Sequence, residues 1–189
     1  EMQRSLVGSE MCIRDRRMVA YTPCYRSEAG TYRASERGMI RGHQFNKVEM
    51  FGYTRPEDSD AMLKELIGKA CALVEGLGLH YRLSKLAAGD CSASMATTYD
   101  IELWIPSMNE YKECSSVSNA HEYQARRGNI RFRRAESKKT EYLHTLNGSG
   151  LATSRVIPAI VEQYQQADGS VVVPEVLRPF LGVDVLRKK

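Results

Sequence analysis

Apolar and polar residues alternate along two well-defined stretches of this chain, residues 79–84 and 99–105. A period of two is typical of strands that bury one face. Neither stretch is followed by the regularly spaced helix that a parallel sheet would need. The pattern therefore favours an antiparallel sheet and an α+β fold. The apolar positions are Leu79, Tyr81 and Leu83 in the first stretch, and Tyr99, Ile101, Leu103 and Ile105 in the second.

Two helices and three more strands are expected around these stretches. Apolar residues at steps of three and four predict a helix over residues 59–75, and a final helix is expected over residues 151–165, with Pro158 inside it. Strands are expected near 19–25 and 40–51, joined by a loop rich in Gly, Ser and charge. A shorter strand at 142–146 precedes Asn147-Gly148-Ser149-Gly150, which resembles a turn.

Composition excludes several classes of protein. The 189 residues carry 27 Lys and Arg against 23 Asp and Glu, a mild excess that is compatible with polyanionic partners but common without them. The five cysteines form no C-x-x-C pair and the four histidines show no ligand spacing, which argues against zinc. No apolar run approaches a membrane span, and residues 1–17 do not resemble a secretory signal. We expect a cytoplasmic protein without a membrane contact.

Arg26, Ser27 and Glu28 form the first group of residues that could carry chemistry. On a strand, Arg26 and Glu28 would share one face. An arginine there can bind a phosphate, and a glutamate can accept a hydrogen bond from an amine such as that of adenine. A surface ion pair is the simpler interpretation of this tripeptide alone.

Arg41, Phe45, Lys47 and Glu49 are all odd-numbered, so one strand face would hold two cations, an aromatic ring and a carboxylate. Such a face can stack a base, pair with phosphate and offer a carboxylate to a small ligand. A solvated strand face is an equally good interpretation.

Two further segments offer ligands for phosphate or its counterion. The segment Glu113-Cys114-Ser115-Ser116 places a carboxylate and a hydroxyl three residues apart, hard oxygen ligands of the kind that Mg²⁺ prefers, although a polar turn is the commoner explanation. Asn147-Gly148-Ser149-Gly150 precedes the final helix as an anion-binding turn would, with Arg155 one turn into that helix. The sequence contains no Walker loop and no dinucleotide fingerprint.

Taken together, these segments resemble the seryl-tRNA synthetase family of class II aminoacyl-tRNA synthetases. The resemblance covers residues 18–182, whereas residues 1–17 look foreign to the family. We therefore divide the chain into a non-family segment, 1–17, and a partial catalytic domain, 18–189. The matching segments are YRSEAG, TYRASERG and MIRGHQFNKVEMF for motif 2, TYDIELWIPSMNEYKECSSVSN for the ATP-site strands, TLNGSGLATSR for motif 3, and the tail VVVPEVLRPFLG.

The resemblance implies a role for each matched residue. ATP would be bound by Arg26, Ser27, Glu28, Arg41, Phe45, Glu113, Cys114, Ser115, Ser116 and Arg155. Arg26 and Arg155 would be catalytic, holding the α- and γ-phosphates. Serine would be bound by Glu49, Asn147 and Ser149, and Mg²⁺, shared with ATP, by Glu113 and Ser116. The implied reaction joins serine to ATP as seryl-adenylate and passes the seryl group to tRNA(Ser). A sheet of six or more antiparallel strands and a homodimer are also implied.

Two segments of this chain depart from the family pattern, although neither departure removes a named ligand. The family often has Gly where this chain has Ser154, and CSASMATT is an unusual version of a small-residue stretch. The tRNA-binding hairpin, motif 1 and the Thr-Ala-Glu serine loop have no counterpart, so we expect the 189-residue chain to be inactive alone. A ligase that charges a carrier protein and a binding module without catalysis are the alternatives.

Overall fold

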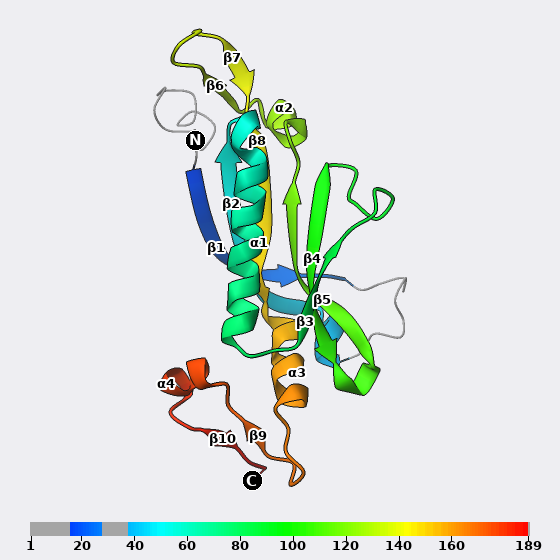
Figure 1. The fold of residues 1–189 in the computed structure, drawn as a ribbon. Helices are drawn as coiled ribbons and strands as arrows, with labels where there is room; N and C mark the ends of the chain where they lie inside the picture. Colours follow the sequence, from blue (N-terminus) through cyan, green and yellow to red (C-terminus); the bar gives the residue numbers. More distant parts are fainter. Residues whose placement is uncertain (1–15, 28–37, 189) are drawn as a thin grey trace.

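A computed structural model describes residues 16–27 and 38–188 and shows a six-stranded sheet at the centre of the fold. Every neighbouring pair of strands in this sheet is antiparallel, which confirms the predicted α+β class. The strands lie in the order β1 (Arg16–Tyr25), β2 (Gln44–Thr54), β8 (His144–Ala152), β5 (Glu110–Asn119), β4 (Thr97–Ile105) and β3 (Tyr81–Lys85) (Figure 1).

Helices α1 (Ser59–Gly76) and α3 (Thr153–Gln163) pack against the sheet and confirm the two helices expected from periodicity. Their apolar sides join the apolar side chains of β2, β8, β5 and β4 in one core cluster. Close approach of α1 to the sheet depends on Gly52, where an added Cβ would lie 3.1 Å from Met62 Cγ. The residues of β4 that face this core are Ile101, Leu103 and Ile105, all fully buried.

Smaller elements surround this core. The single-turn helix η1 (Gly38–Arg41) precedes β2, and η2 (Pro56–Asp58) and η3 (Pro106–Met108) follow β2 and β4. A hairpin of β6 (Arg131–Arg133) and β7 (Thr140–Tyr142) follows α2 (Tyr123–Gly128), and β9 (Val171–Val172), η4 (Glu175–Leu177), α4 (Arg178–Leu181) and β10 (Val185–Leu186) form the C-terminal part. None of the helices in the described ranges is long and apolar enough to cross a membrane.

Three local expectations were wrong. Asn147 to Gly150 form no turn but lie within β8, which pairs with β2 on one side and β5 on the other. Gly148 is needed there because an added Cβ would lie 2.9 Å from Val117 Cγ2. Arg41 ends η1 instead of sharing the β2 face, and Leu83 is 46% exposed because β3 is an edge strand.

Candidate active site

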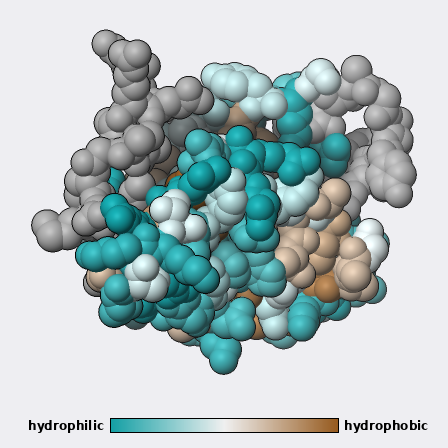
Figure 2. Space-filling view, turned by 90° about the horizontal axis from the view of Figure 1, so that it is seen from above, coloured by the Kyte–Doolittle hydropathy of each residue, from teal (hydrophilic) through white to brown (hydrophobic). Residues whose placement is uncertain are grey.

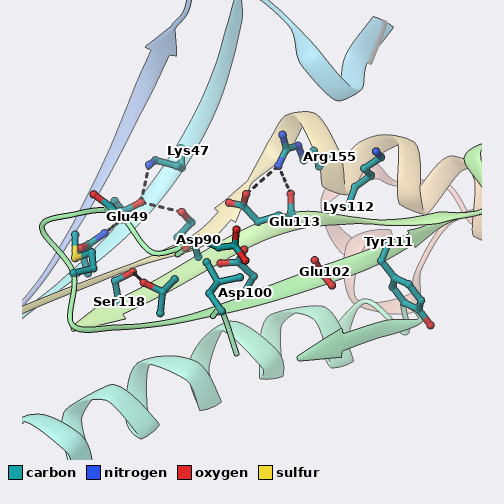
Figure 3. A pocket seen from close by; sticks show the side chains of 17 residues that line it. Lys47, Glu49, Asp90, Asp100, Glu102, Tyr111, Lys112, Glu113, Ser118 and Arg155 are labelled. Atoms are coloured by element: carbon teal, nitrogen blue, oxygen red, sulfur yellow. Dashed lines mark hydrogen bonds and ion pairs between the residues drawn. The ribbon is translucent and has the colours of Figure 1, made fainter. Parts of the chain in front are cut away.

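The sheet presents polar side chains on the face opposite to the core, and these line a cavity of about 800 Å³. Register places them side by side on neighbouring strands. Glu49 on β2 faces Ser149 on β8, and Ser116 on β5 faces Asp100 on β4. A parallel row contains Asn147, Ser118 and Thr98. Figure 3 shows carboxylates from β2, β4 and β5 gathered around this space.

Glu49 is the most highly connected carboxylate of the cavity. Asn147 Nδ2 donates to its Oε1 over 2.8 Å, and Ser149 Oγ donates to its Oε2 over 3.0 Å. Lys47 Nζ lies 2.9 Å from the same Oε2 (Figure 3). Although Glu49 is only 8% exposed, these partners hold its charge in place. Such a carboxylate is suited to a small ligand that carries a hydroxyl or an ammonium group.

A second, smaller cavity of about 70 Å³ adjoins the first. Arg26, Arg41 and Phe45 line it, and the Arg26 guanidinium lies over the Phe45 ring at 5.2 Å from the centroid. The backbone N–H of Arg26 donates to the His43 carbonyl over 2.9 Å, which fixes the chain just beyond the end of β1. An aromatic ring beside two arginines can bind a base and its phosphates. The residues that line both cavities are Lys47, Glu113, Ser149 and Arg155.

Arg155 lies in the first turn of α3 and is 9% exposed. Its Nη1 donates to the Glu113 carbonyl over 2.6 Å and lies 3.5 Å from Glu113 Oε2, while Nε lies 3.4 Å from the Ile40 carbonyl (Figure 3). These contacts hold a cationic fork between the two cavities. An anion that spanned both cavities would contact the Arg155 guanidinium.

An irregularity in β5 brings Glu113 and Ser116 to the same cavity. The register against β4 shifts between Ile101 and Glu102, whose partners are Ser115 and Glu113, so Cys114 is an extra residue. Cys114 lies in the apolar core, and Ser115 is fully buried with its hydroxyl donating to the Ser149 carbonyl over 2.6 Å. Of the four predicted ligands in this segment, Glu113 and Ser116 line the cavity. Cys114 and Ser115 are buried beneath it and do not line it.

Asp100 is a second buried acid of the cavity, beside Glu49. It is 8% exposed, and its Oδ1 is buried without a hydrogen-bond partner in the structure. The pKa of its carboxyl is raised to about 6, mainly by burial and also by the neighbouring Glu113 and Glu102, whereas the hydrogen bond from the Ser116 hydroxyl opposes the shift. A buried oxygen of this kind favours a cation or a proton donor in the cavity.

The described residues contain no group of three or more His, Cys, Asp or Glu able to hold a metal by themselves. Mg²⁺ commonly needs only one or two carboxylates when it is shared with phosphate. Glu113 is 42% exposed at its side chain and shares the cavity with the Ser116 hydroxyl. This donor set, a carboxylate and a hydroxyl, fits a magnesium ion that arrives with a nucleotide.

Most residues that the sequence singled out converge on the two adjoining cavities. Glu28 lies outside the described residues, and Ser27 follows β1 at an exposed position. Sequence reasoning named no role for several other lining residues, although polar positions alternating with buried Ile101 and Leu103 were a usable signal. The polar cavity residues that sequence reasoning missed are Asp90, Ser92, Thr98, Asp100, Glu102, Tyr111, Lys112 and Ser118.

Comparison with known proteins finds relatives that match most of this chain. Serine--tRNA ligase 2 of Clostridium acetobutylicum is 79% identical over 167 residues, 88% of this chain and 39% of that protein. Serine--tRNA ligase of Thermotoga maritima is 54% identical over 171 residues, 90% of this chain and 40% of that protein. The chain thus spans about two fifths of the length of the curated relatives it matches.

Solved structures and a family model lead to the same family. Seryl-tRNA synthetase from Pyrococcus horikoshii complexed with ATP superposes with a TM-score of 0.88 at 41% identity, over 93% of this chain and 39% of that one. Cytoplasmic serine-tRNA ligase from Naegleria fowleri in complex with AMP gives 0.85 at 36% identity, over 93% and 42%. The family model described as tRNA synthetase class II core domain (G, H, P, S and T) matches residues 6–164, and the chain belongs to that family.

Proposed function

We propose that this protein is a serine–tRNA ligase. By the full-length protein we mean a chain of the length of these relatives. It activates serine with ATP and passes the seryl group from the adenylate to tRNA(Ser). The observation that carries this proposal is the Glu49 carboxylate, bound by Asn147 and Ser149 where a polar cavity meets an arginine-lined one. The curated relatives bear the same name, and solved relatives hold ATP or AMP.

Glu49 selects the amino acid in this proposal. The serine hydroxyl or ammonium donates to Glu49 and replaces Lys47, while Asn147 and Ser149 orient the carboxylate. Where the serine hydroxyl is the donor, alanine would leave the buried carboxylate without that partner, which is costly, so alanine is rejected.

ATP lies across the two cavities, with its adenine at the arginine-lined one and its phosphates extending past the shared residues into the large one. Adenine stacks on Phe45, which requires the Arg26 guanidinium to leave the ring and reach the α-phosphate. Glu28 then accepts from the adenine amino group. Arg41 contacts the phosphates, and Arg155 binds the γ-phosphate from the opposite side. With two arginines neutralising the phosphate charge, the serine carboxylate attacks the α-phosphorus and pyrophosphate leaves.

Glu113 and Ser116 are the residues that hold Mg²⁺ in this proposal. The ion supplies positive charge to the phosphate oxygens. Arg155 orients the Glu113 side chain through its Nη1 contact, and the bulge at Cys114 keeps the Ser116 hydroxyl on the cavity side. Glu113 and Ser116 thus provide two oxygen ligands, and the phosphates and water provide the others.

The assembly and compartment complete the proposal. We expect a homodimer that acts on tRNA(Ser) without a membrane partner. Cys24, Cys71, Cys91 and Cys114 are free thiols in the described residues, which suits the reducing cytoplasm.

Serine-dependent exchange of pyrophosphate into ATP by the full-length protein tests activation. Serine should support exchange at least tenfold faster than alanine, glycine or threonine, and tRNA(Ser) should then be charged. Equal exchange with the other amino acids, or none with serine, would overturn the proposal. Transfer to a carrier protein instead of tRNA would identify the alternative ligase. The 189-residue chain assayed beside it should show no exchange.

A further inference from the structure

The net charge of the chain is concentrated in one segment at one end of the sheet. Residues 122–142, which form α2 and the β6–β7 hairpin, contain seven Lys and Arg but three Glu, an excess equal to the +4 of the whole chain. The other residues therefore carry equal numbers of both signs. We call this segment the basic hairpin; its cations are Arg126, Arg127, Arg131, Arg133, Arg134, Lys138 and Lys139.

Six of these seven cations are exposed, and the seventh, Arg134, is half-buried. Figure 2 looks down on the end of the molecule where the basic hairpin lies, and the surface there is largely hydrophilic. Arg134 serves the fold, because it binds Glu57 and Glu141. Arg126 is paired with Glu122. The remaining cations of the basic hairpin are Arg127, Arg131, Arg133, Lys138 and Lys139.

Two arginines of the basic hairpin stack on tyrosine rings. Arg127 lies 3.9 Å from the centroid of the Tyr123 ring, and Arg131 lies 4.8 Å from that of Tyr142 while donating to the Tyr142 hydroxyl. Rings beneath guanidinium groups hold them in fixed orientations. Arg131 and Arg133 share one face of β6, about 6.6 Å apart along the strand. Alternation places Phe132 between them in a small apolar cluster, which anchors the strand.

The hairpin also encloses a small cavity of about 110 Å³. A water molecule takes about 30 Å³ of liquid volume, so the cavity has room for one phosphate group. Its charged lining is four cations and one acid: Arg55, Arg133, Arg134, Lys138 and Glu136. Arg55 pairs with Glu57 and Asp58, and Arg134 with Glu57 and Glu141. Arg133 Nε donates to the Lys138 carbonyl over 3.1 Å, which holds these two basic residues together at the cavity.

The position of the hairpin relative to the active site favours RNA as the partner. Tyr142, at the end of β7, is five residues before Asn147 of the large cavity, a span of at most about 18 Å. Arg131 pairs with Tyr142 across the hairpin and so lies at the same end of it. An RNA whose 3′ end reached the cavity would bring the phosphates of its next nucleotides toward this end of the hairpin. Arginine and aromatic side chains together are typical of RNA-binding surfaces.

We propose that the basic hairpin is an RNA-backbone binding site, which contacts phosphates near the acceptor end of the tRNA substrate. The proposal rests on the proposed function, since it assumes that tRNA is the acceptor. Arg131, Arg133, Lys138 and Lys139 provide the phosphate contacts, and Arg134 positions the hairpin.

The test compares two full-length variants with equal loss of charge. The first carries Arg131→Gln, Arg133→Gln, Lys138→Gln and Lys139→Gln. The matched control carries Lys64→Gln, Lys85→Gln, Arg187→Gln and Lys188→Gln, which are exposed cations elsewhere. Binding of a tRNA(Ser) transcript is titrated at several salt concentrations. The hairpin variant should bind at least tenfold more weakly than the control, and its salt slope should fall by about 0.7–0.9 per lost contact.

Serine-dependent pyrophosphate exchange, which requires no RNA, separates the two hypotheses. Normal exchange in both variants with selective loss of RNA affinity supports the site. Equal RNA affinities and slopes in the two variants overturn it while leaving the proposed function intact. No exchange in the unmodified protein overturns the proposed function instead. A change of oligomeric state in the hairpin variant alone would show a protein interface and overturn the RNA site. If that variant unfolds, the Lys138→Gln, Lys139→Gln pair at the hairpin tip gives the same comparison.

Discussion

Glu113 and Ser116 lie three residues apart on β5, yet both side chains line the same cavity. In a regular strand they would point to opposite faces of the sheet. The extra residue Cys114 resets the alternation, so that Glu113 and Ser116 return to one side. The bulge thus builds a two-oxygen site from a segment whose plain alternation would divide it.

Ser116→Ala in the full-length protein should weaken ATP binding about tenfold when Mg²⁺ is present, because an oxygen ligand is lost. With EDTA the affinities of variant and parent should agree. Titration calorimetry under both conditions measures this. Ser118→Ala is the control, since that side chain lines the same cavity but its hydroxyl pairs with Thr98. An equal loss in both variants would show a general packing effect.

Arg26→Ala should reduce serine-dependent exchange about 10²–10³-fold with the fold intact, because a preorganised charge contact to the phosphate is lost. Arg155→Ala should show a similar loss of rate. Arg155 is nearly buried and binds two backbone carbonyls, so its removal should also lower the free energy of unfolding. Near-normal exchange in either variant would contradict the role assigned to that arginine. Urea titrations separate the loss of stability from the loss of rate.

Glu49→Gln should raise the KM for serine more than the KM for ATP, because a neutral amide pairs poorly with an ammonium group. The amide is of similar size, so Asn147 and Ser149 keep a partner. Exchange kinetics with each substrate varied in turn measure the split. If the KM for ATP rises and that for serine does not, Glu49 binds a different ligand.

Replacement of two glycines by alanine should change the free energy of unfolding in opposite directions. Gly148→Ala should lower the free energy of unfolding by about 1–3 kcal/mol, since the new Cβ would meet Val117 at 2.9 Å. Gly68, inside α1, has nothing within 4 Å of an added Cβ. Gly68→Ala should therefore raise stability by about 0.5–1 kcal/mol. Urea unfolding of both variants provides the measurement, and a shared direction would contradict it.

Sequence periodicity predicted the elements whose burial follows one face, such as α1, α3 and β4. It misread Asn147 to Gly150, because Gly148 in the strand reflects close packing against Val117, a contact that depends on tertiary structure. Asp100 escaped notice for the same reason. Its polar side chain alternates with buried Ile101, yet only the sheet register reveals that it faces Ser116 inside a cavity. Contacts between residues on neighbouring strands that are far apart in the sequence cannot be predicted from sequence spacing alone.

The Arg134–Glu57 pair should make a small, pH-dependent contribution to stability. Arg134 Nη1 and Nη2 donate to the two Glu57 oxygens over 2.7 and 3.0 Å, joining the basic hairpin to η2. The hydrogen bond from Arg134 lowers the pKa of Glu57 from 4.5 to about 2. A lowered pKa means that the stabilisation is fully present above pH 4.5 and is lost as the pH falls toward 2.

Glu57→Gln should therefore lower the free energy of unfolding near neutral pH, by less than about 1 kcal/mol because the side chain is 43% exposed. The difference from the parent should shrink as the pH falls below 4.5. Urea titrations at several pH values between 3 and 7 measure it. Within an Arg134→Gln background the same substitution should have little pH-dependent effect, because the lowering of the pKa depends on that arginine. A difference that stays constant with pH in the parent background would show that the pair does not hold the pKa of Glu57 down.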